Sequence, residues 1–171
     1  MLVVGQPDSP LVAEARTAGL PLQSVAMPNP FHLSAIRRLR ALFRARGVRL
    51  VHTHSSVDSW AAGLAAKSLG LPVVRSRHVT IPVSRARALV YRLADRVITS
   101  GEAVKAVLVA AGVRADKIVA IAPGIDPTRF HRGVSGTAVR QELGLRGPAV
   151  GLVANLRGFE APALCPFPIP E

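Results

Sequence analysis

Short apolar runs alternate with longer stretches of helical periodicity along this chain. The apolar runs predict strands at residues 2–5, 22–27, 49–54, 72–77, 96–100, 118–122 and 149–154. The stretches between them predict helices at residues 10–19, 33–47, 57–70, 85–95, 102–112 and 136–144. Because strands separated by helices of this length form βαβ units, the pattern predicts an α/β fold with a Rossmann-like parallel sheet flanked by helices.

Several predicted helix ends carry local signals. Ser9 and Ser55 stand just ahead of helical stretches, and Asp58 follows Ser55 at the spacing of a capping box. Ser100 precedes a third helix in the same way. Glycines close four of the helices, at Gly19, Gly47, Gly70 and Gly112. These signals support the division into helices and strands.

The composition excludes several classes of protein. With 171 residues, 49% of them apolar, the chain is long enough to bury a core, so global disorder is not expected. Cys165 is the single cysteine, which excludes a disulfide scaffold. Apolar runs stay well short of the roughly 18 residues that a membrane span requires. We therefore expect a cytoplasmic protein.

The formal net charge of +12 introduces a second class of function. Such an excess favours a polyanionic partner, and a non-catalytic basic domain that binds a polyanion or an anionic membrane surface is the alternative function. Only three of the cations are lysines, so solvated arginine faces or biased codon usage explain the charge equally well. Aromatic residues make up only 4% of the chain and offer few stacking platforms, so nucleic acid is not an expected partner.

Candidate chemistry gathers where the strand at 49–54 ends. His52, His54, Ser55 and Ser56 follow one another there, and ligands of open α/β sheets bind just outside the carboxyl ends of the strands. Neither a glycine-rich dinucleotide turn nor a P-loop is present. The two histidines flank one residue without a cysteine cluster nearby, so we expect no metal site.

Several stretches carry a family resemblance in register along the chain. They are Val-His-Thr-His at 51–54, Gly-Leu-Pro-Val-Val-Arg-Ser-Arg-His at 70–78, Ala-Asp-Arg-Val-Ile-Thr-Ser at 94–100, and Pro-Gly-Ile-Asp at 123–126 with Phe130. In this order and spacing they closely resemble retaining glycosyltransferases of family 4. The resemblance implies the GT-B fold, in which two Rossmann-like domains face each other across a cleft.

The resemblance also implies an activity. Relatives transfer a hexose or similar sugar from a nucleotide diphosphate sugar to an acceptor hydroxyl with retention at the anomeric carbon. They need no metal or other cofactor, and the acceptor is a sugar, a lipid-linked molecule or a glycan. Synthesis of envelope polysaccharide, lipopolysaccharide or glycolipid is the expected setting.

The chain departs from the family at both ends. Residues 1–146 correspond to the acceptor-side domain without its first strand and glycine-rich loop, and residues 147–159 to the first strand of the donor-side domain. Residues 160–171 contain four prolines and no helical period, so we expect an irregular tail and a frameshift or fragment boundary near residue 160. An incomplete GT-B enzyme of this kind is expected to be inactive alone, because closure of two domains assembles the site.

Family positions suggest roles for individual residues. His78 matches a histidine that faces the donor sugar, although a histidine that satisfies a strand-end carbonyl is the simpler alternative. His54 either holds its loop or contacts the acceptor. Ser55 and Ser56 are candidates for binding acceptor hydroxyls, independently of any family position, but capping explains Ser55 equally well and is favoured. Glu102 matches a family acid and also suits the positive end of a helix dipole.

The donor side offers one weak candidate. The cations that neutralise the diphosphate leaving group in the family fall on Asn155 and Glu160, which cannot take that role. Arg157 lies between them and is the remaining candidate for diphosphate contact.

The predicted helix at 33–47 is basic and amphipathic. Its apolar side carries Ile36, Leu39, Leu42 and Phe43, and its arginines are Arg37, Arg38, Arg40, Arg44 and Arg46. Such a helix either packs on the sheet or contacts the inner face of the cytoplasmic membrane as a peripheral element. Because a βαβ crossover must cover the sheet, packing is favoured.

Overall fold

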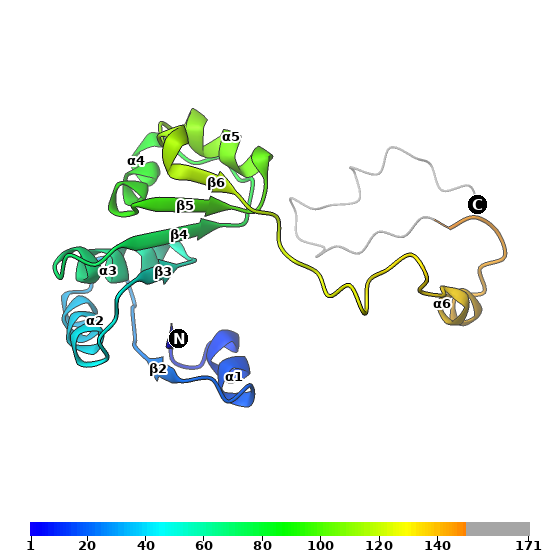
Figure 1. The fold of residues 1–171 in the computed structure, drawn as a ribbon, viewed down its shortest axis with the longest axis horizontal. Coiled ribbons are helices and arrows are strands. Elements are labelled where there is room, and N and C mark those ends of the chain that lie inside the picture. The colour runs from blue at the N-terminus through cyan, green and yellow to red at the C-terminus, as the bar shows by residue number, and fades with distance from the viewer. Residues whose placement is uncertain (150–171) are drawn as a thin grey trace. The chain divides into compact units, whose positions relative to one another are not determined.

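The computed structural model describes residues 1–149 (Figure 1). Its strands are β1 (Val3–Gly5), β2 (Leu22–Ser24), β3 (Val51–Thr53), β4 (Val73–Arg77), β5 (Arg96–Thr99) and β6 (Ile118–Ala120). Its helices are α1 (Pro10–Thr17), α2 (Leu33–Ala45), α3 (Ser56–Lys67), α4 (Arg85–Ala88), α5 (Glu102–Ala110) and α6 (Thr137–Glu142), with 3₁₀ helices η1 (Leu89–Leu93) and η2 (Ala115–Lys117). The predicted α/β alternation is confirmed, while the strand predicted at 149–154 lies almost wholly outside the described residues.

The strands form two parallel sheets rather than one continuous sheet. β3, β4, β5 and β6 are neighbours in that order and lie side by side in Figure 1, whereas β1 pairs only with β2 among the described strands. In the larger sheet Val51 pairs with Val73, and Val97 pairs with Ile118. The carboxyl ends of β3, β4 and β5 therefore share one edge.

The core lies where helices cover the larger sheet. α2 packs on α3 (Figure 1), and α3 turns a row of small side chains inward, so the two helices approach closely. The buried alanines of that row are Ala61, Ala62, Ala65 and Ala66. Leu39 from α2, Val73 from β4 and Val97 from β5 are at most 2% exposed and anchor the layer.

Helix α2 uses its apolar side for this core. Ala35, Leu39 and Phe43 are buried, and Ile36 packs against them. All five arginines named for this helix are exposed. The burial supports the packing interpretation of α2 and leaves a basic outer face.

Most of the local signals act as predicted. Ser9 accepts a hydrogen bond from the Val12 amide, and Ser55 forms a complete capping box with Asp58. The four helix-closing glycines have φ between 57° and 89°, the left-handed region that favours glycine. Ser100 is a correction, because Gly101 occupies the N-cap of α5 and makes no side-chain cap. The predicted helix at 85–95 also divides into α4 and η1.

The chain separates into two compact units, Met1–Gly124 and Ile125–Glu171. The first contains both sheets. The described part of the second contains α6, and its residues are exposed. The predicted domain boundary at residue 146 stays a prediction, as does the tail at 160–171, which lies outside the described residues. Within residues 1–149, none of the helices combines the length and apolar character needed to cross a bilayer.

Candidate functional site

Three histidines meet at the carboxyl edge of the larger sheet. His52 lies within β3, His54 follows it, and His78 follows β4. The Nδ1 atom of His54 lies 3.3 Å from Nε2 of His78, and the two rings stack with centroids 5.6 Å apart and planes 4° from parallel. The His52 and His54 rings have centroids 4.4 Å apart. The structure thus brings together the residues that the sequence placed at this edge.

The contact between His54 and His78 is a hydrogen bond with one hydrogen between the two nitrogens. Since each ring nitrogen either carries a hydrogen or offers a lone pair, one ring must donate and the other accept. Both residues are exposed, so a ligand at this end of the sheet has access to their rings. A pair of imidazoles in this state can bind sugar hydroxyls as donor or acceptor.

His52 is held in a different environment. Its Nε2 atom lies 2.8 Å from the Ser76 hydroxyl, which is buried on β4. Partial burial lowers the pKa of His52 below its ordinary value, and repulsion from His54 and His78 lowers it further, against a weaker pull from Asp58. His52 is therefore more strongly held in its neutral form than a free histidine.

The start of α3 fixes the loop that carries His54. The Asp58 carboxylate accepts from the His54 amide at 3.3 Å and from the Ser55 amide at 2.8 Å. The Asp58 amide donates in turn to the Ser55 hydroxyl at 3.4 Å. Ser59 donates to Thr53, which joins the helix to the end of β3. The capping interpretation of Ser55 is confirmed, and a contact between Ser55 and an acceptor stays a prediction.

The other predicted site residues are less closely joined to the histidines. Ser56 is the exposed first residue of α3. Glu102 is the exposed first residue of α5, where its charge suits the helix dipole, and within residues 1–149 no hydrogen bond links it to the histidines. Arg157 lies outside the described residues. The acceptor roles of Ser56 and Glu102 and the diphosphate role of Arg157 stay predictions.

Two contacts that the sequence did not predict hold the segment around His78. The Ser100 hydroxyl donates to the His78 carbonyl at 3.3 Å, which ties the end of β4 to β5. Arg77 donates to the carbonyl of Ile81 and so holds the loop that follows His78. The Ser100 contact satisfies the backbone carbonyl of His78 itself. The role of the His78 side chain stays a prediction, and so does its alternative.

A buried arginine lies in β4, three residues before His78. Arg75 is 4% exposed, and its guanidinium carbon lies 4.1 Å from the centre of the Tyr91 ring. Its Nε and Nη1 atoms have no hydrogen-bond partner within residues 1–149. Burial lowers its pKa, while Tyr91 and Asp58 oppose that shift. The aromatic face of Tyr91 is therefore the principal stabilising contact of this cation.

The described residues include no cluster of three or more histidine, cysteine, aspartate or glutamate side chains arranged to hold a metal ion. The polar groups at this end of the strands are imidazoles, hydroxyls, backbone groups and the Asp58 carboxylate, which accepts from the His54 and Ser55 amides. This set is suited to hydrogen bonding with a hydroxylated ligand.

Comparison with known proteins places this chain in a family. The model of Glycosyltransferase Family 4 matches residues 2–129. Among solved structures, Anabaena Alr3699/HepE in complex with UDP matches 84% of this chain with a TM-score of 0.69 and 18% identity. A glycosyltransferase from Rickettsia africae ESF-5 matches 85% with a TM-score of 0.67 and 19% identity. MurG from Acinetobacter baumannii matches 72% with a TM-score of 0.55 and 18% identity.

These likenesses confirm the predicted fold, that of the amino-terminal domain of a GT-B glycosyltransferase. The chain spans less than half of each of these proteins: 42% of the Anabaena chain, 41% of the Rickettsia chain and 36% of MurG. No curated protein matches the chain.

Proposed function

The chain belongs to glycosyltransferase family 4, and from this premise we propose that it supplies the acceptor-side half of a sugar-transfer site. The complete site transfers a sugar from a nucleotide diphosphate sugar to an acceptor hydroxyl, with retention at the anomeric carbon. The sugar is of the hexose type. No metal or other cofactor is required.

The observation that carries this proposal is the meeting of His54 and His78 at the carboxyl edge of β3 and β4. Their nitrogens lie 3.3 Å apart, both rings are exposed, and separate contacts to Asp58 and Ser100 hold the two supporting segments. Neutral imidazole can donate to a sugar hydroxyl and can lie beside the cationic, oxocarbenium-like carbon of glycosyl transfer. His78 is proposed to face the transferred sugar. His54, Ser55, Ser56 and Glu102 are proposed to face the acceptor.

In the proposed reaction the sugar donor also supplies the leaving group. UDP is bound in the Anabaena structure, which supports a nucleotide diphosphate as the leaving group here. Arg157 is the proposed cation for the diphosphate. A preorganised positive charge at that position stabilises the negative charge that develops as the bond to the sugar breaks.

We expect the chain alone to have little or no transferase activity. Transfer in a two-domain enzyme depends on closure, which excludes water and assembles the donor and acceptor groups. Incubation of the purified 171-residue chain with nucleotide sugars and hydroxylated acceptors, followed by mass spectrometry, tests this point. Robust product formation would show that a second half-site is unnecessary.

The setting proposed is the cytoplasmic side of the envelope, in polysaccharide, lipopolysaccharide or glycolipid synthesis. The exposed arginines of α2 favour contact with an anionic membrane surface, because basic residues are attracted to acidic lipids. Ala35, Leu39 and Phe43 are buried in the core, so the apolar side of α2 is not available to insert into a bilayer. The proposed membrane contact therefore depends on the charge of the arginines. Sedimentation with phosphatidylglycerol vesicles should fall in an R37Q/R38Q/R40Q variant. Equal sedimentation of both proteins would remove α2 from the contact.

This charged face is also the observation that favours the alternative function, a non-catalytic basic domain that holds a polyanion. The two functions differ in their ligands. A basic domain binds heparin and phosphatidylglycerol vesicles without preference for a sugar nucleotide, and its binding falls steeply with salt. A sugar site discriminates between ligands that differ only in the sugar.

Saturation-transfer NMR with UDP-glucose, UDP and glucose tests the proposed function. We expect saturation of the glucose protons of UDP-glucose by the wild-type chain and its loss in His78→Ala. His131→Ala is the matched control, because His131 is also exposed and lies in the second unit. Saturation that survives in His78→Ala, or that never reaches the sugar, would contradict the assignment.

A further inference from the structure

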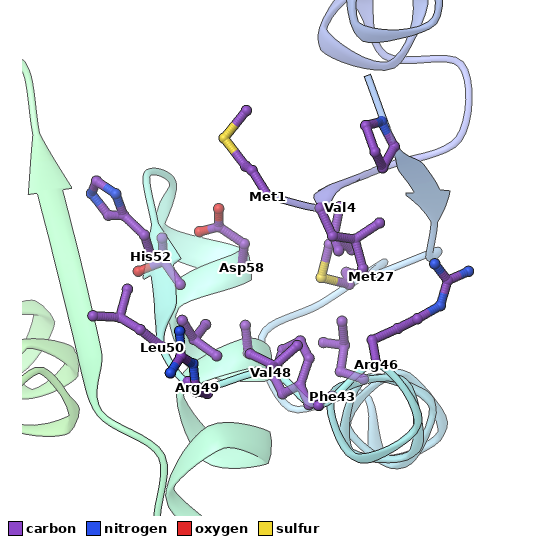
Figure 2. Close-up of a pocket in the computed structure, with 17 residues that line it drawn as sticks. Met1, Val4, Met27, Phe43, Arg46, Val48, Arg49, Leu50, His52 and Asp58 are labelled. Atoms are coloured by element: carbon purple, nitrogen blue, oxygen red, sulfur yellow. The ribbon is translucent and has the colours of Figure 1, made fainter. Parts of the chain in front are cut away.

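A second hollow in the first unit lies away from the histidines. One hollow, of about 470 Å³, adjoins the candidate site, because His52, Thr53 and Asp58 line it beside apolar side chains such as Met27 (Figure 2). The second, of about 480 Å³, is lined by side chains from residues 85–92, in α4 and η1, and from residues 111–117, between α5 and β6. We call this second one the α4–α5 hollow.

The α4–α5 hollow lies at the opposite edge of the sheet from the candidate site. η1 ends at Leu93 and leads into β5 at Arg96, and η2 ends at Lys117 and leads into β6. The segments that line the hollow therefore reach the amino ends of β5 and β6. Because the strands from β3 to β6 are parallel, the histidines at the carboxyl ends of β3 and β4 lie at the other edge. A ligand in this hollow is not held by the groups of the candidate site.

Cations surround this hollow. Among the described residues that line it none is acidic and four are basic, namely Arg85, Arg92, Arg114 and Lys117. Arg114 is neutralised by Asp116, whose carboxylate accepts from its Nε at 3.0 Å. The Lys117 ammonium donates to the Ala94 carbonyl at 3.1 Å, which fixes its position but leaves its charge. Within residues 1–149 neither ion pair includes Arg85 or Arg92. Three cations from three segments therefore face an anion that enters the hollow.

The floor of the hollow is apolar and aromatic. Ala88, Tyr91, Ala111 and Val113 line it and are each at most 8% exposed. Leu89 also lines it and is partly exposed. The volume lies within the range of small-molecule sites, which combine an apolar lining with a few polar groups that fix orientation. A ligand that suits this lining therefore carries both an apolar body and an anionic group.

We propose that the α4–α5 hollow binds an organic phosphate, a phosphate monoester carried on an apolar body. Phosphate suits cations from separate segments, because its oxygens accept several charge-assisted hydrogen bonds at once and arginine binds it in a forked geometry. A concave surface with one sign of charge also raises the local concentration of anions. A soluble phosphate ester and the headgroup of a phosphate-bearing lipid share this chemistry. The inference holds whether or not the chain transfers sugars.

Tyr91 connects the hollow to the segment that carries His78. Its ring lies against the Arg75 guanidinium, and its hydroxyl accepts from Arg77 at 3.4 Å. Arg77 in turn holds the loop after His78 through the Ile81 carbonyl. Tyr91 is the single tyrosine of the chain, so its ring gives one unambiguous set of NMR signals for the floor of the hollow.

The test titrates hexyl phosphate into the full 171-residue chain and follows the ring signals of Tyr91 and His78 by NMR. Tyr91 should shift saturably, with a dissociation constant of about 1 mM or lower, and should shift more than His78 at the other edge. Inorganic phosphate lacks the apolar body and hexanol lacks the charge. Each should bind at least about tenfold more weakly than hexyl phosphate.

Paired substitutions show which cations hold the phosphate. R85Q/R92Q removes two cations of the hollow and should weaken hexyl phosphate binding at least about tenfold, because charge-assisted hydrogen bonds are lost. R16Q/R132Q is the matched control, since Arg16 and Arg132 are exposed, neither lines the hollow, and the net charge falls equally. In physiological salt its affinity should change by less than about twofold, because distant charges are screened.

Vesicles separate the two sources of the phosphate. Phosphatidylcholine vesicles that contain phosphatidic acid present the same phosphate monoester as a lipid headgroup. Sedimentation of the wild-type chain with these vesicles, lost in R85Q/R92Q and kept in R16Q/R132Q, assigns the hollow to a lipid headgroup. Binding of hexyl phosphate without this difference between the variants assigns it to a soluble ester.

Other results contradict the proposal. An unchanged Tyr91 signal, equal binding of hexanol or of inorganic phosphate, or equal losses in the two double variants would overturn it. A larger shift at His78 than at Tyr91 would place the anion at the candidate site instead of the hollow. If R85Q/R92Q does not fold, Arg92→Gln alone decides: a loss of at least about threefold in affinity is expected, and an unchanged affinity counts against the hollow.

Discussion

The imidazoles of His54 and His78 lie parallel, with Nδ1 of the first 3.3 Å from Nε2 of the second. They are 24 residues apart in the chain and meet because β3 and β4 are parallel neighbours that end at one edge. This pair is the centre of the candidate site. Its hydrogen bond, its surroundings and its supporting helix each lead to a measurable expectation.

The shared hydrogen bond restricts the neutral tautomers of the pair. If His54 donates through Nδ1, then His78 must accept at Nε2 and carry its own hydrogen on Nδ1; if His78 donates, both hydrogens lie on Nε2. Both rings must therefore have the same tautomer. Ring nitrogen shifts recorded by NMR at pH 8 check this, and His54→Ala should free His78 from the restriction. Opposite tautomers in the wild-type chain would exclude the hydrogen bond.

The lowered pKa of His52 makes stability depend on pH in a defined direction. The unfolded chain binds a proton near the ordinary value of 6.5, whereas the folded chain resists protonation until a lower pH. Between these values the unfolded state holds more protons, so stability falls as the pH drops below about 6.5. Urea unfolding between pH 8 and pH 5 should show a smaller decline in His52→Gln than in the wild type. His131→Gln is the control, and a decline of the same size in all three proteins would contradict the assignment to His52.

The capping box of α3 predicts unequal effects for two adjacent serines. Ser55→Ala removes the hydroxyl that accepts from the Asp58 amide and should cost about 1 kcal/mol in the free energy of unfolding. Ser56→Ala alters an exposed first-turn position and should change it by less than about 0.5 kcal/mol. Chemical denaturation measures both. Equal losses would mean that the Ser55 hydroxyl does not cap the helix.

The buried Arg75 predicts a dependence on Tyr91. Tyr91→Leu removes the ring beneath the guanidinium and should destabilise the chain by about 2 kcal/mol or more, through the lost cation contact and the lost packing. Arg75→Met removes the buried charge and should be tolerated, because a well-packed apolar side chain often replaces such a cation without loss. In the Arg75→Met background Tyr91→Leu should cost less. Additive losses in this double-mutant cycle would show that the two side chains do not interact.

The sequence predicted the elements because their signals are local. Ser55 and Asp58 lie three residues apart, so their capping box is visible without knowledge of the fold. Gly47 and Gly70 each end a helix with a positive φ for the same local reason. Ser100 carried a similar signal but donates to His78 instead, because a partner 22 residues away lies within reach only in the folded sheet.

The remaining features depend on strand register and packing. The contact of His52 with Ser76 joins two strands, and the ring of Tyr91 over Arg75 joins a strand to a 3₁₀ helix. No periodicity in the chain encodes which side chains lie opposite one another. The resemblance to the family singled out His54 and His78, whose roles stay predictions, and the structure adds that the two side chains contact each other.

The most direct test of the proposed half-site follows the ring signals of His54 and His78 by NMR while UDP-glucose is added to the full chain. UDP alone and glucose alone are the comparison ligands, and His131 is the internal reference. The account predicts that the rings of His54 and His78 shift with UDP-glucose, more than with UDP, while His131 does not move. Unchanged rings of His54 and His78 at saturating UDP-glucose, or shifts of the same size at His131, would contradict it.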